Sequence, residues 1–294
     1  FEYERVDKAY SITTALQNAI TASLALFAEV SLLSFTETPD ATRSVGNLRF
    51  ATYDGGAADG YGSGTVGTNS SAYYPGISSH NPRYPWLAGD IWLDGDGPYT
   101  GVGSNEFNKS SNLIDGSYYT QTIIHEIGHS LGLSHPHQDE RGYGLDSTIG
   151  KNESTMSYAD FSGDATNDGG NLLQAPHTLM VRDIAALQAM YGVNYQHNTG
   201  DNVYTISSFS SENYIYASIW DAGGNDTISW AGQTTAGYID LQAGYARLQA
   251  RYIGLQARGV TRRGGESGKS ELVCDTAINV GRASGRDGRE HRPR

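Results

Sequence analysis

The motif HEIGHSLGLSHP, at residues 125–136, combines residue types that can bind a metal ion and activate water. His125 and His129 are four residues apart, so on a helix they lie on one face and can hold one ion together. Glu126 stands beside them, where its carboxylate can reach a water molecule at the ion without binding the metal itself. The spacing therefore predicts a helix that carries two metal ligands and a general base.

A third ligand is expected just beyond the end of that helix. Gly132 can adopt the positive φ with which helices often end, and the resulting turn brings His135 back toward the other two imidazoles. Three neutral imidazoles leave a fourth tetrahedral position for water, which is the arrangement of a catalytic zinc site. We expect His137, next to this site, to be exposed. The alternatives are ordinary surface or core histidines and a relative that has lost its activity.

The residues around the motif indicate the elements that position it. Apolar residues recur at helical spacing over residues 11–30, and again over 181–191, so both stretches are predicted to be helices. Ser117 can cap the helix that carries the histidines. Strands are expected over residues 30–37, 47–53 and 87–93. Strands that precede the metal-binding helix, with a closing helix after it, indicate an α+β fold.

Charge divides the 294-residue chain into two unequal parts. Residues 1–244 hold 9 Lys+Arg and 27 Asp+Glu, a net −18, whereas residues 245–294 hold 11 and 5, a net +6. An acidic body favours cation binding and argues against nucleic acid or an anionic membrane as partner. The longest apolar stretch, residues 19–28, is too short to span a bilayer. The single cysteine, Cys274, leaves the body without disulfides and does not decide the compartment.

A methionine follows the metal motif in the run STMSY, at residues 154–158. In a tight turn, Met156 can lie beneath the metal site as a soft apolar floor. HExxHxxGxxH followed by such a Met-turn is the metzincin pattern. Together with Pro136, the run TMSY and the later VRDIAALQAMYG, it resembles the serralysin family of secreted bacterial metalloproteases. Another metzincin branch is the alternative.

The resemblance covers roughly residues 10–245 and implies a domain plan. A metzincin-type zinc protease domain, with a mixed twisted sheet and long helices, would occupy residues 1–195. The start of a calcium-binding parallel β-roll would occupy residues 196–244. The function implied is a secreted, extracellular zinc endopeptidase of broad specificity that acts on proteins and peptides. We also expect a monomer that a proteinaceous inhibitor can bind, with no membrane span.

The resemblance also assigns roles to single residues. Glu126 would take a proton from the zinc-bound water and pass it to the departing amine. Tyr158 would coordinate the resting zinc and then stabilise the transition state. An extended substrate would lie along the edge strand that precedes the metal-binding helix. The residues expected to bind it there are Gly89, Asp90, Ile91 and Trp92.

A second metal is suggested by DAGGNDTI, at residues 221–228, which matches imperfectly the nonapeptide repeat of calcium β-rolls. One copy is a weak signal, and a GGND turn in an ordinary hairpin is the alternative. By the resemblance, the run NTGDN at residues 198–202 joins the first repeat in binding Ca²⁺ through hard oxygen ligands. The candidate calcium ligands are Asn198, Gly200, Asn202, Asp221, Gly223 and Asp226.

Both ends of the chain depart from the resemblance. The N-terminus begins without methionine or a visible export signal, so we expect a processed or truncated product. After residue 244 the expected repeats give way to an arginine-rich tail. We hypothesise a reading-frame change or truncation near residue 245 that leaves residues 245–294 disordered, and a basic nucleic-acid or membrane arm is the alternative.

Two functions of other classes compete with the protease. One is a calcium-binding repeat or surface module with an inactive protease domain. The other is a structural or adhesive surface module. Zinc content and peptide hydrolysis separate both from the enzyme, and neither accounts for an intact set of ligands, base and Met-turn.

Overall fold

The computed structural model describes residues 9–38, 46–53, 70–72, 88–94, 106–137, 148–159, 175–205, 217–229 and 271–273. Its helices are α2 (Thr14–Val30), α3 (Tyr118–Ser130) and α4 (Val181–Tyr191), with one 3₁₀ turn, η3 (Glu106–Asn108). The strands are β1 (Ala9–Tyr10), β2 (Arg49–Tyr53), β3 (Ser71–Ala72), β4 (Asp90–Asp94), β5 (Val203–Thr205), β6 (Thr227–Ser229) and β7 (Glu271–Val273). The glycine-rich run at 54–69 and most of the basic tail lie outside these residues.

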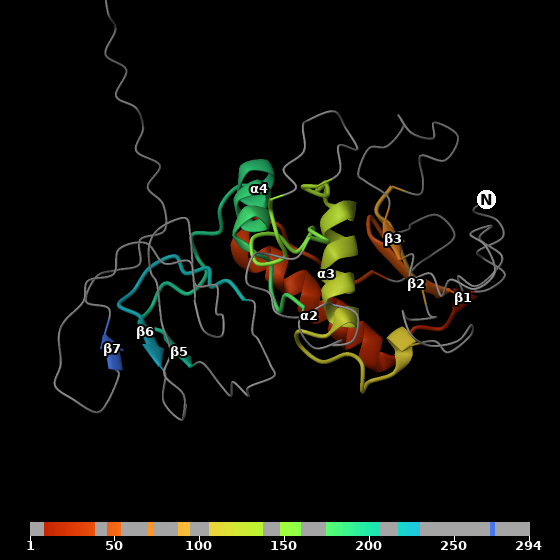
Figure 1. The fold of residues 1–294 in the computed structure, drawn as a ribbon, viewed down its shortest axis with the longest axis horizontal. Coiled ribbons are helices and arrows are strands. Elements are labelled where there is room, and N and C mark those ends of the chain that lie inside the picture. Colours follow the sequence, from red (N-terminus) through yellow and green to blue (C-terminus); the bar gives the residue numbers. More distant parts are fainter. Residues whose placement is uncertain are drawn as a thin grey trace, which may run out of the picture.

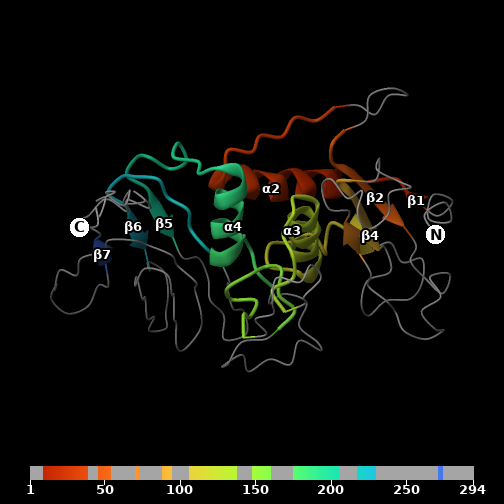
Figure 2. The same cartoon turned by 90° about the horizontal axis from the view of Figure 1, so that it is seen from above.

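Three helices lie between two small sheets. Figures 1 and 2 show β1 to β4 at one end of the molecule and β5 to β7 at the other, with α2, α3 and α4 between them. The first sheet has the order β1-β2-β4-β3, in which β2 and β4 are parallel and the outer strands antiparallel. In the second sheet β5 and β6 are parallel, and β7 joins β6 antiparallel. The mixture of helices and strands agrees with the α+β prediction.

Two predicted strands are found, and one expectation about the second of them is wrong. Residues 47–53 supply β2 and residues 87–93 supply most of β4. However, β4 is an inner strand, because β2 pairs along its whole length and β3 pairs with Ile91 and Trp92. The Asp90 carboxylate is buried and forms an ion pair with Arg49. Gly89, Asp90, Ile91 and Trp92 therefore do not form a free edge for substrate.

The helix predicted over 11–30 is α2, and it overrides the strand predicted to begin at residue 30. Val30 is the last residue of α2 and continues its buried face, which runs through Leu16, Ile20 and Phe27. Ser31 then closes the helix by donating from its hydroxyl and its amide to the Phe27 carbonyl. Helical packing thus outweighs the local β-propensity of this stretch. Beyond an isolated bridge at Ser31, residues 32–38 form no strand.

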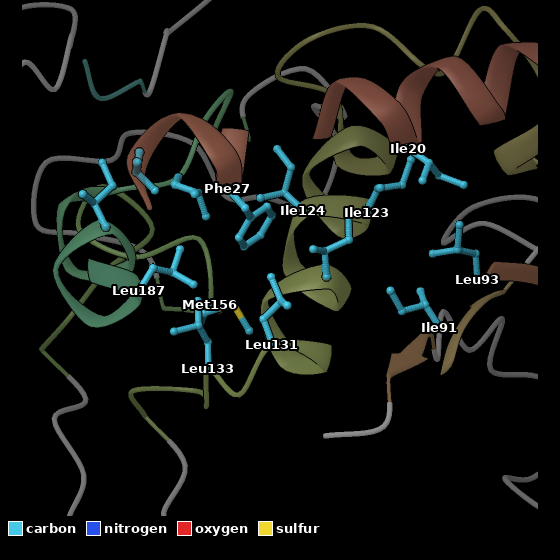
Figure 3. Packing of buried hydrophobic residues seen from close by; sticks show 14 of the residues in the cluster. Ile20, Phe27, Ile91, Leu93, Ile123, Ile124, Leu131, Leu133, Met156 and Leu187 are labelled. Atoms are coloured by element: carbon cyan, nitrogen blue, oxygen red, sulfur yellow. The ribbon is translucent and has the colours of Figure 1, made fainter. Parts of the chain in front are cut away.

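The hydrophobic core encloses α3 from two sides. Figure 3 shows Ile91 and Leu93 of β4 on the side of Ile123, and Phe27 of α2 close to Ile124. All of these side chains are buried, and α3 itself is buried from Tyr119 to Ser130. Burial on this scale holds the helix rigid, because close-packed interiors leave little room for displacement. Within the described residues, no helix is both long and apolar enough to cross a membrane.

Candidate metal centre and its surroundings

Three imidazoles meet at the C-terminal half of α3. The Nε2 atoms of His125, His129 and His135 lie 3.0, 3.0 and 3.1 Å apart in pairs. Metal ligands in proteins come mainly from His, Cys, Asp and Glu side chains. Among the described residues, these three histidines form the one group of three or more such side chains whose ligand atoms all lie within 4.8 Å of one another. The spacing of the motif, and the turn after it, therefore bring the three predicted ligands together.

Hydrogen bonds at the Nδ1 atoms of His125 and His129 fix which nitrogen of each ring faces the other histidines. His125 Nδ1 lies 3.0 Å from the Thr155 carbonyl, and His129 Nδ1 lies 2.8 Å from the Leu133 carbonyl. A carbonyl oxygen only accepts, so each Nδ1 carries the proton and each Nε2 presents a lone pair. Burial and the neighbouring imidazole of His129 hold the pKa of His125 well below its usual value, which keeps the ring neutral.

The geometry fits a tetrahedral zinc ion. With Zn–N bonds of about 2.0–2.1 Å, the nitrogens of a tetrahedral site lie about 3.3 Å apart, close to the spacing seen here. Converging lone pairs repel one another unless a cation lies among them. Hydrogen bonds from the opposite ring nitrogens to protein groups are the usual second layer of such a site. A set of three imidazole donors is that of a catalytic zinc centre.

The end of α3 places the third ligand. Gly132 has φ +104°, its amide donates to the His129 carbonyl, and the Leu133 amide donates to the Gly128 carbonyl. This pair of bonds is the Schellman arrangement, which needs a residue that tolerates positive φ. It also presents the Leu133 carbonyl to His129. At the other end Ser117 caps α3 as predicted, accepting from the Thr120 amide at 3.2 Å.

The Met-turn packs directly against α3, the helix that carries His125 and His129. Met156 is 1% exposed, and Figure 3 shows it beside Leu131 and Leu133. A Cβ added at Gly128 would lie 2.6 Å from the Met156 sulfur. Gly128 is one of the unspecified positions of HExxH, so motif reasoning gave it no role. The structure shows that a side chain there would meet the floor of the site.

The two predicted catalytic residues, Glu126 and Tyr158, differ in exposure. Glu126 is buried, burial raises the pKa of its carboxyl to about 8, and its Oε2 has no hydrogen-bond partner among the described residues. Tyr158 is 54% exposed and places its hydroxyl 3.3 Å from His125 Nε2. The Tyr158 ring stacks on that of His125 at 17°. The residue next to His125 in sequence thus has a buried oxygen without a partner, and a phenol lies at the solvent-exposed side of His125.

His137 does not have the exposed position expected of it. Its side chain is half-buried, and both ring nitrogens are covered. The ring centroid lies 4.9 Å from that of Tyr158 and 5.2 Å from that of His135. The expectation failed because the turn that returns His135 to the centre also folds the next residues against the Tyr158 ring.

Several supporting residues escaped sequence reasoning because they lie far from the motif or in its variable positions. Asp183, the third residue of α4, accepts hydrogen bonds from the Ser154 hydroxyl and the Thr155 amide. Gln121, one turn before His125, donates to the Thr155 carbonyl. The Tyr191 hydroxyl donates to the Leu131 carbonyl at the end of α3. Only the proximity of Gln121 to the motif offered any signal.

The predicted calcium ligands gather at the start of the second sheet. Asp221 and Asp226 are each 1% exposed. The Asn202 amide donates to Asp226 Oδ1 at 2.8 Å, and the Gly223 amide donates to Asp221 Oδ1 at 2.8 Å. Asn198 has φ +49° and donates from its side chain to the Tyr204 hydroxyl. The runs 198–202 and 221–226 therefore lie side by side.

Unpaired oxygens mark this second cluster. Asp226 Oδ2 and Asn202 Oδ1 are buried without a hydrogen-bond partner among the described residues. Burial raises the pKa of Asp226, and the Asp221 and Asp201 carboxylates raise it further. A Cβ added at Gly224 would lie 2.1 Å from the Gly200 carbonyl oxygen. Buried oxygens that lack hydrogen-bond partners and lie near other carboxylates are suitable ligands for a hard cation. Asp201, in the predicted run but not among the predicted ligands, belongs to the same cluster.

Comparison with known proteins gives matches over most of the chain. Residues 3–160 match the Matrixin family model, and residues 182–247 match the model of the serralysin C-terminal domain of peptidase family M10. Metallopeptidase AprA of Pseudomonas marginalis is 33% identical over 245 residues, covering 76% of this chain and 46% of that protein. Serralysin C of Dickeya chrysanthemi is 33% identical over 195 residues, 60% of this chain and 36% of that protein.

A third relative gives the same picture. Serralysin of Proteus mirabilis is 31% identical over 230 residues, which are 69% of this chain and 44% of that protein. The chain thus spans about half the length of these relatives or less. The match to the C-terminal model ends at residue 247, close to the point where the charge of the sequence changes sign.

The contact between Gly128 and Met156 predicts a coupled pair of substitutions. Gly128→Ala should lower the free energy of unfolding by about 1–3 kcal/mol, because the new methyl group must displace the Met156 sulfur. In the background of Met156→Ala the same change should cost less, because the space is then free. Urea denaturation of the four proteins measures this coupling. Equal costs in both backgrounds would show that the sulfur is not the obstacle.

Proposed function

We propose that this chain, which belongs to the serralysin-type metzincin family, is a zinc-dependent endopeptidase that hydrolyses internal peptide bonds. The observation that carries the proposal is the convergence of three imidazoles, with a buried and unpaired carboxylate oxygen next to one of them in sequence. The Matrixin match over residues 3–160 supports the same function. Broad specificity is proposed by family resemblance.

His125, His129 and His135 would hold the ion through Nε2. The chemistry that zinc supplies when bound is Lewis-acid polarisation of the peptide carbonyl and activation of water. Glu126 would accept the proton of the attacking water at its carboxylate and deliver it to the departing amine. Its place next to His125 in sequence and its buried Oε2, which has no hydrogen-bond partner among the described residues, support this role.

Tyr158 would stabilise the charge that develops on the oxygen of the attacked carbonyl. Its hydroxyl already lies at the ligand cluster, 3.3 Å from His125 Nε2. The exposure of the ring leaves it free to move aside when a substrate enters. A phenol donor aimed at a developing oxyanion is a common form of transition-state stabilisation.

The substrate would lie extended against the edge of the first sheet. Among the described strands, β3 stands at this edge, and it packs against α3. Backbone pairing at an edge strand holds a peptide with little demand on its side chains. This arrangement supports a protease that accepts many sequences. The substrate backbone would then pair with β3 instead of with β4, the strand expected from the sequence.

We infer that the second cluster binds Ca²⁺ as the first turn of a parallel β-roll. The proposed ligands are Asn198, Gly200, Asn202, Asp221, Gly223 and Asp226. Support comes from the orphaned oxygens of Asp226 and Asn202, the parallel pairing of β5 with β6, and the serralysin C-terminal match. An ion there would relieve the repulsion between neighbouring carboxylates.

We further infer that the protein acts outside the cell as a monomer that a protein inhibitor can bind. The match to serralysins supports the extracellular location, and the monomeric state and the inhibitor are proposed by family resemblance alone. A calcium module without protease activity is the competing function. The buried Glu126 and the complete histidine set favour the enzyme over it.

Replacing the proposed base tests the function most simply. Glu126→Gln should retain zinc at one ion per chain but lower the rate of casein hydrolysis by at least about 100-fold, because the amide cannot accept the proton. Glu29→Gln is the matched control and should keep the wild-type rate, because the Glu29 carboxylate, on α2, lies 3.9 Å from His197 Nε2 and is 42% exposed. Near-normal hydrolysis by zinc-loaded Glu126→Gln would remove Glu126 from the mechanism.

The calcium site makes its own prediction. Calcium should raise the melting temperature of the wild-type protein, because an ion that binds only the folded state stabilises it. Asp226→Asn should reduce this increase, whereas Asp115→Asn, at an exposed position, should leave it unchanged. Thermal denaturation with and without calcium measures both. A wild-type protein that is indifferent to calcium would contradict the site.

A further inference from the structure

Asp183 is a buried carboxylate whose contacts reach well beyond its own helix. It is 3% exposed and accepts three hydrogen bonds: from the Ser154 hydroxyl at 2.6 Å, the Thr155 amide at 2.6 Å and the Met180 amide at 3.0 Å. Met180 precedes the first residue of α4, so that bond caps the helix. The other two bonds go to the Met-turn, more than 25 residues earlier.

The residue whose amide Asp183 accepts from, Thr155, also contacts a proposed zinc ligand through its carbonyl. The Thr155 carbonyl lies 3.0 Å from His125 Nδ1 and accepts from Gln121 Nε2 at 3.0 Å. The Thr155 side chain in turn donates to the Thr178 carbonyl. A chain of contacts therefore runs from Asp183 through Thr155 to His125.

A capping role alone does not account for these contacts. An acidic residue at the third position of a helix stabilises the exposed amides and the helix dipole, and the Met180 amide is sufficient for that. Capping does not require bonds to Ser154 and Thr155. Burial of the carboxylate also carries a desolvation cost, which raises the pKa of Asp183 and which its hydrogen bonds oppose. The Met-turn contacts therefore need a reason of their own.

We propose that Asp183 is a positioning residue for the metal centre, which fixes the Thr155 carbonyl against His125 Nδ1 and thereby raises the affinity of the three histidines for zinc. This inference rests on the proposed function. Without the carboxylate the Thr155 amide loses its acceptor, and the Met-turn can rotate. His125 then loses the acceptor that keeps the proton on Nδ1 and leaves Nε2 free for the ion.

The test is the zinc dissociation constant, measured by competition with a chromophoric chelator. Asp183→Ala should weaken zinc binding by about 10–100-fold, the usual effect of removing a group that orients a metal ligand. Asp183→Asn should weaken zinc binding less than Asp183→Ala does, because the side-chain amide oxygen can still accept hydrogen bonds from the Thr155 and Met180 amides. Glu106→Gln is the matched control: Glu106 is 4% exposed and bonded to Lys109 and Asn112, and its loss should leave the zinc affinity unchanged.

A second readout separates positioning from general destabilisation. In zinc-loaded wild-type protein with ¹⁵N-labelled histidine, the His125 Nδ1 proton should give a slowly exchanging, hydrogen-bonded signal. Asp183→Ala should broaden or shift that signal, Asp183→Asn should largely restore it, and Glu106→Gln should not affect it. Should Asp183→Ala fail to fold, Ser154→Ala, which removes one of the two Met-turn contacts, replaces it.

The outcomes distinguish this inference from the proposed function. Folded Asp183→Ala with wild-type zinc affinity and an unchanged His125 signal would overturn the positioning role and leave the protease function standing. A folded wild-type protein that binds no zinc would instead overturn the function itself. Weaker binding in Asp183→Ala with no change in the control supports the proposal.

Discussion

The structure depends on two hydrogen bonds that face away from the metal centre. The Thr155 and Leu133 carbonyls accept hydrogen bonds from the Nδ1–H groups of His125 and His129, so the Nε2 lone pairs of both rings point inward toward His135. These two lone pairs, with His135 Nε2 about 3 Å from each, favour a bound cation. Because both acceptors are backbone carbonyls, the course of the chain itself sets the chemistry of the site.

The rest of the described fold keeps those two carbonyls in place. The Leu133 carbonyl is set by the turn at Gly132, which needs a residue that accepts positive φ. The Thr155 carbonyl is set by the Met-turn, which rests on Gly128 and is tied to α4 through Asp183. Figure 3 shows buried side chains of α2 and β4 on two sides of α3. This close packing holds the helix from which the first turn continues and against which the second turn packs. Helices, sheet and turns thus together fix the positions of the Leu133 and Thr155 carbonyls.

Local sequence pattern predicted what depends on local geometry. The four-residue spacing of the histidines, the cap at Ser117 and the helices over 11–30 and 181–191 all follow from helix periodicity and end signals. Strand order does not follow from such local signals. The inner position of β4 depends on its pairing with β3, at residues 71–72, which the sequence pattern did not predict. The anchoring of the Met-turn by Asp183 and the burial of His137 likewise depend on contacts that no spacing encodes.

Hydrolysis of unfolded casein before and after zinc removal tests the central claim most directly. Treatment with phenanthroline should abolish cleavage, and addition of zinc should restore it, in wild-type protein that remains folded throughout. His135→Ala, which removes the ligand beyond the helix, should not recover under the same zinc addition. Cleavage that persists without zinc, or a folded and zinc-loaded protein that cleaves nothing, would contradict the account.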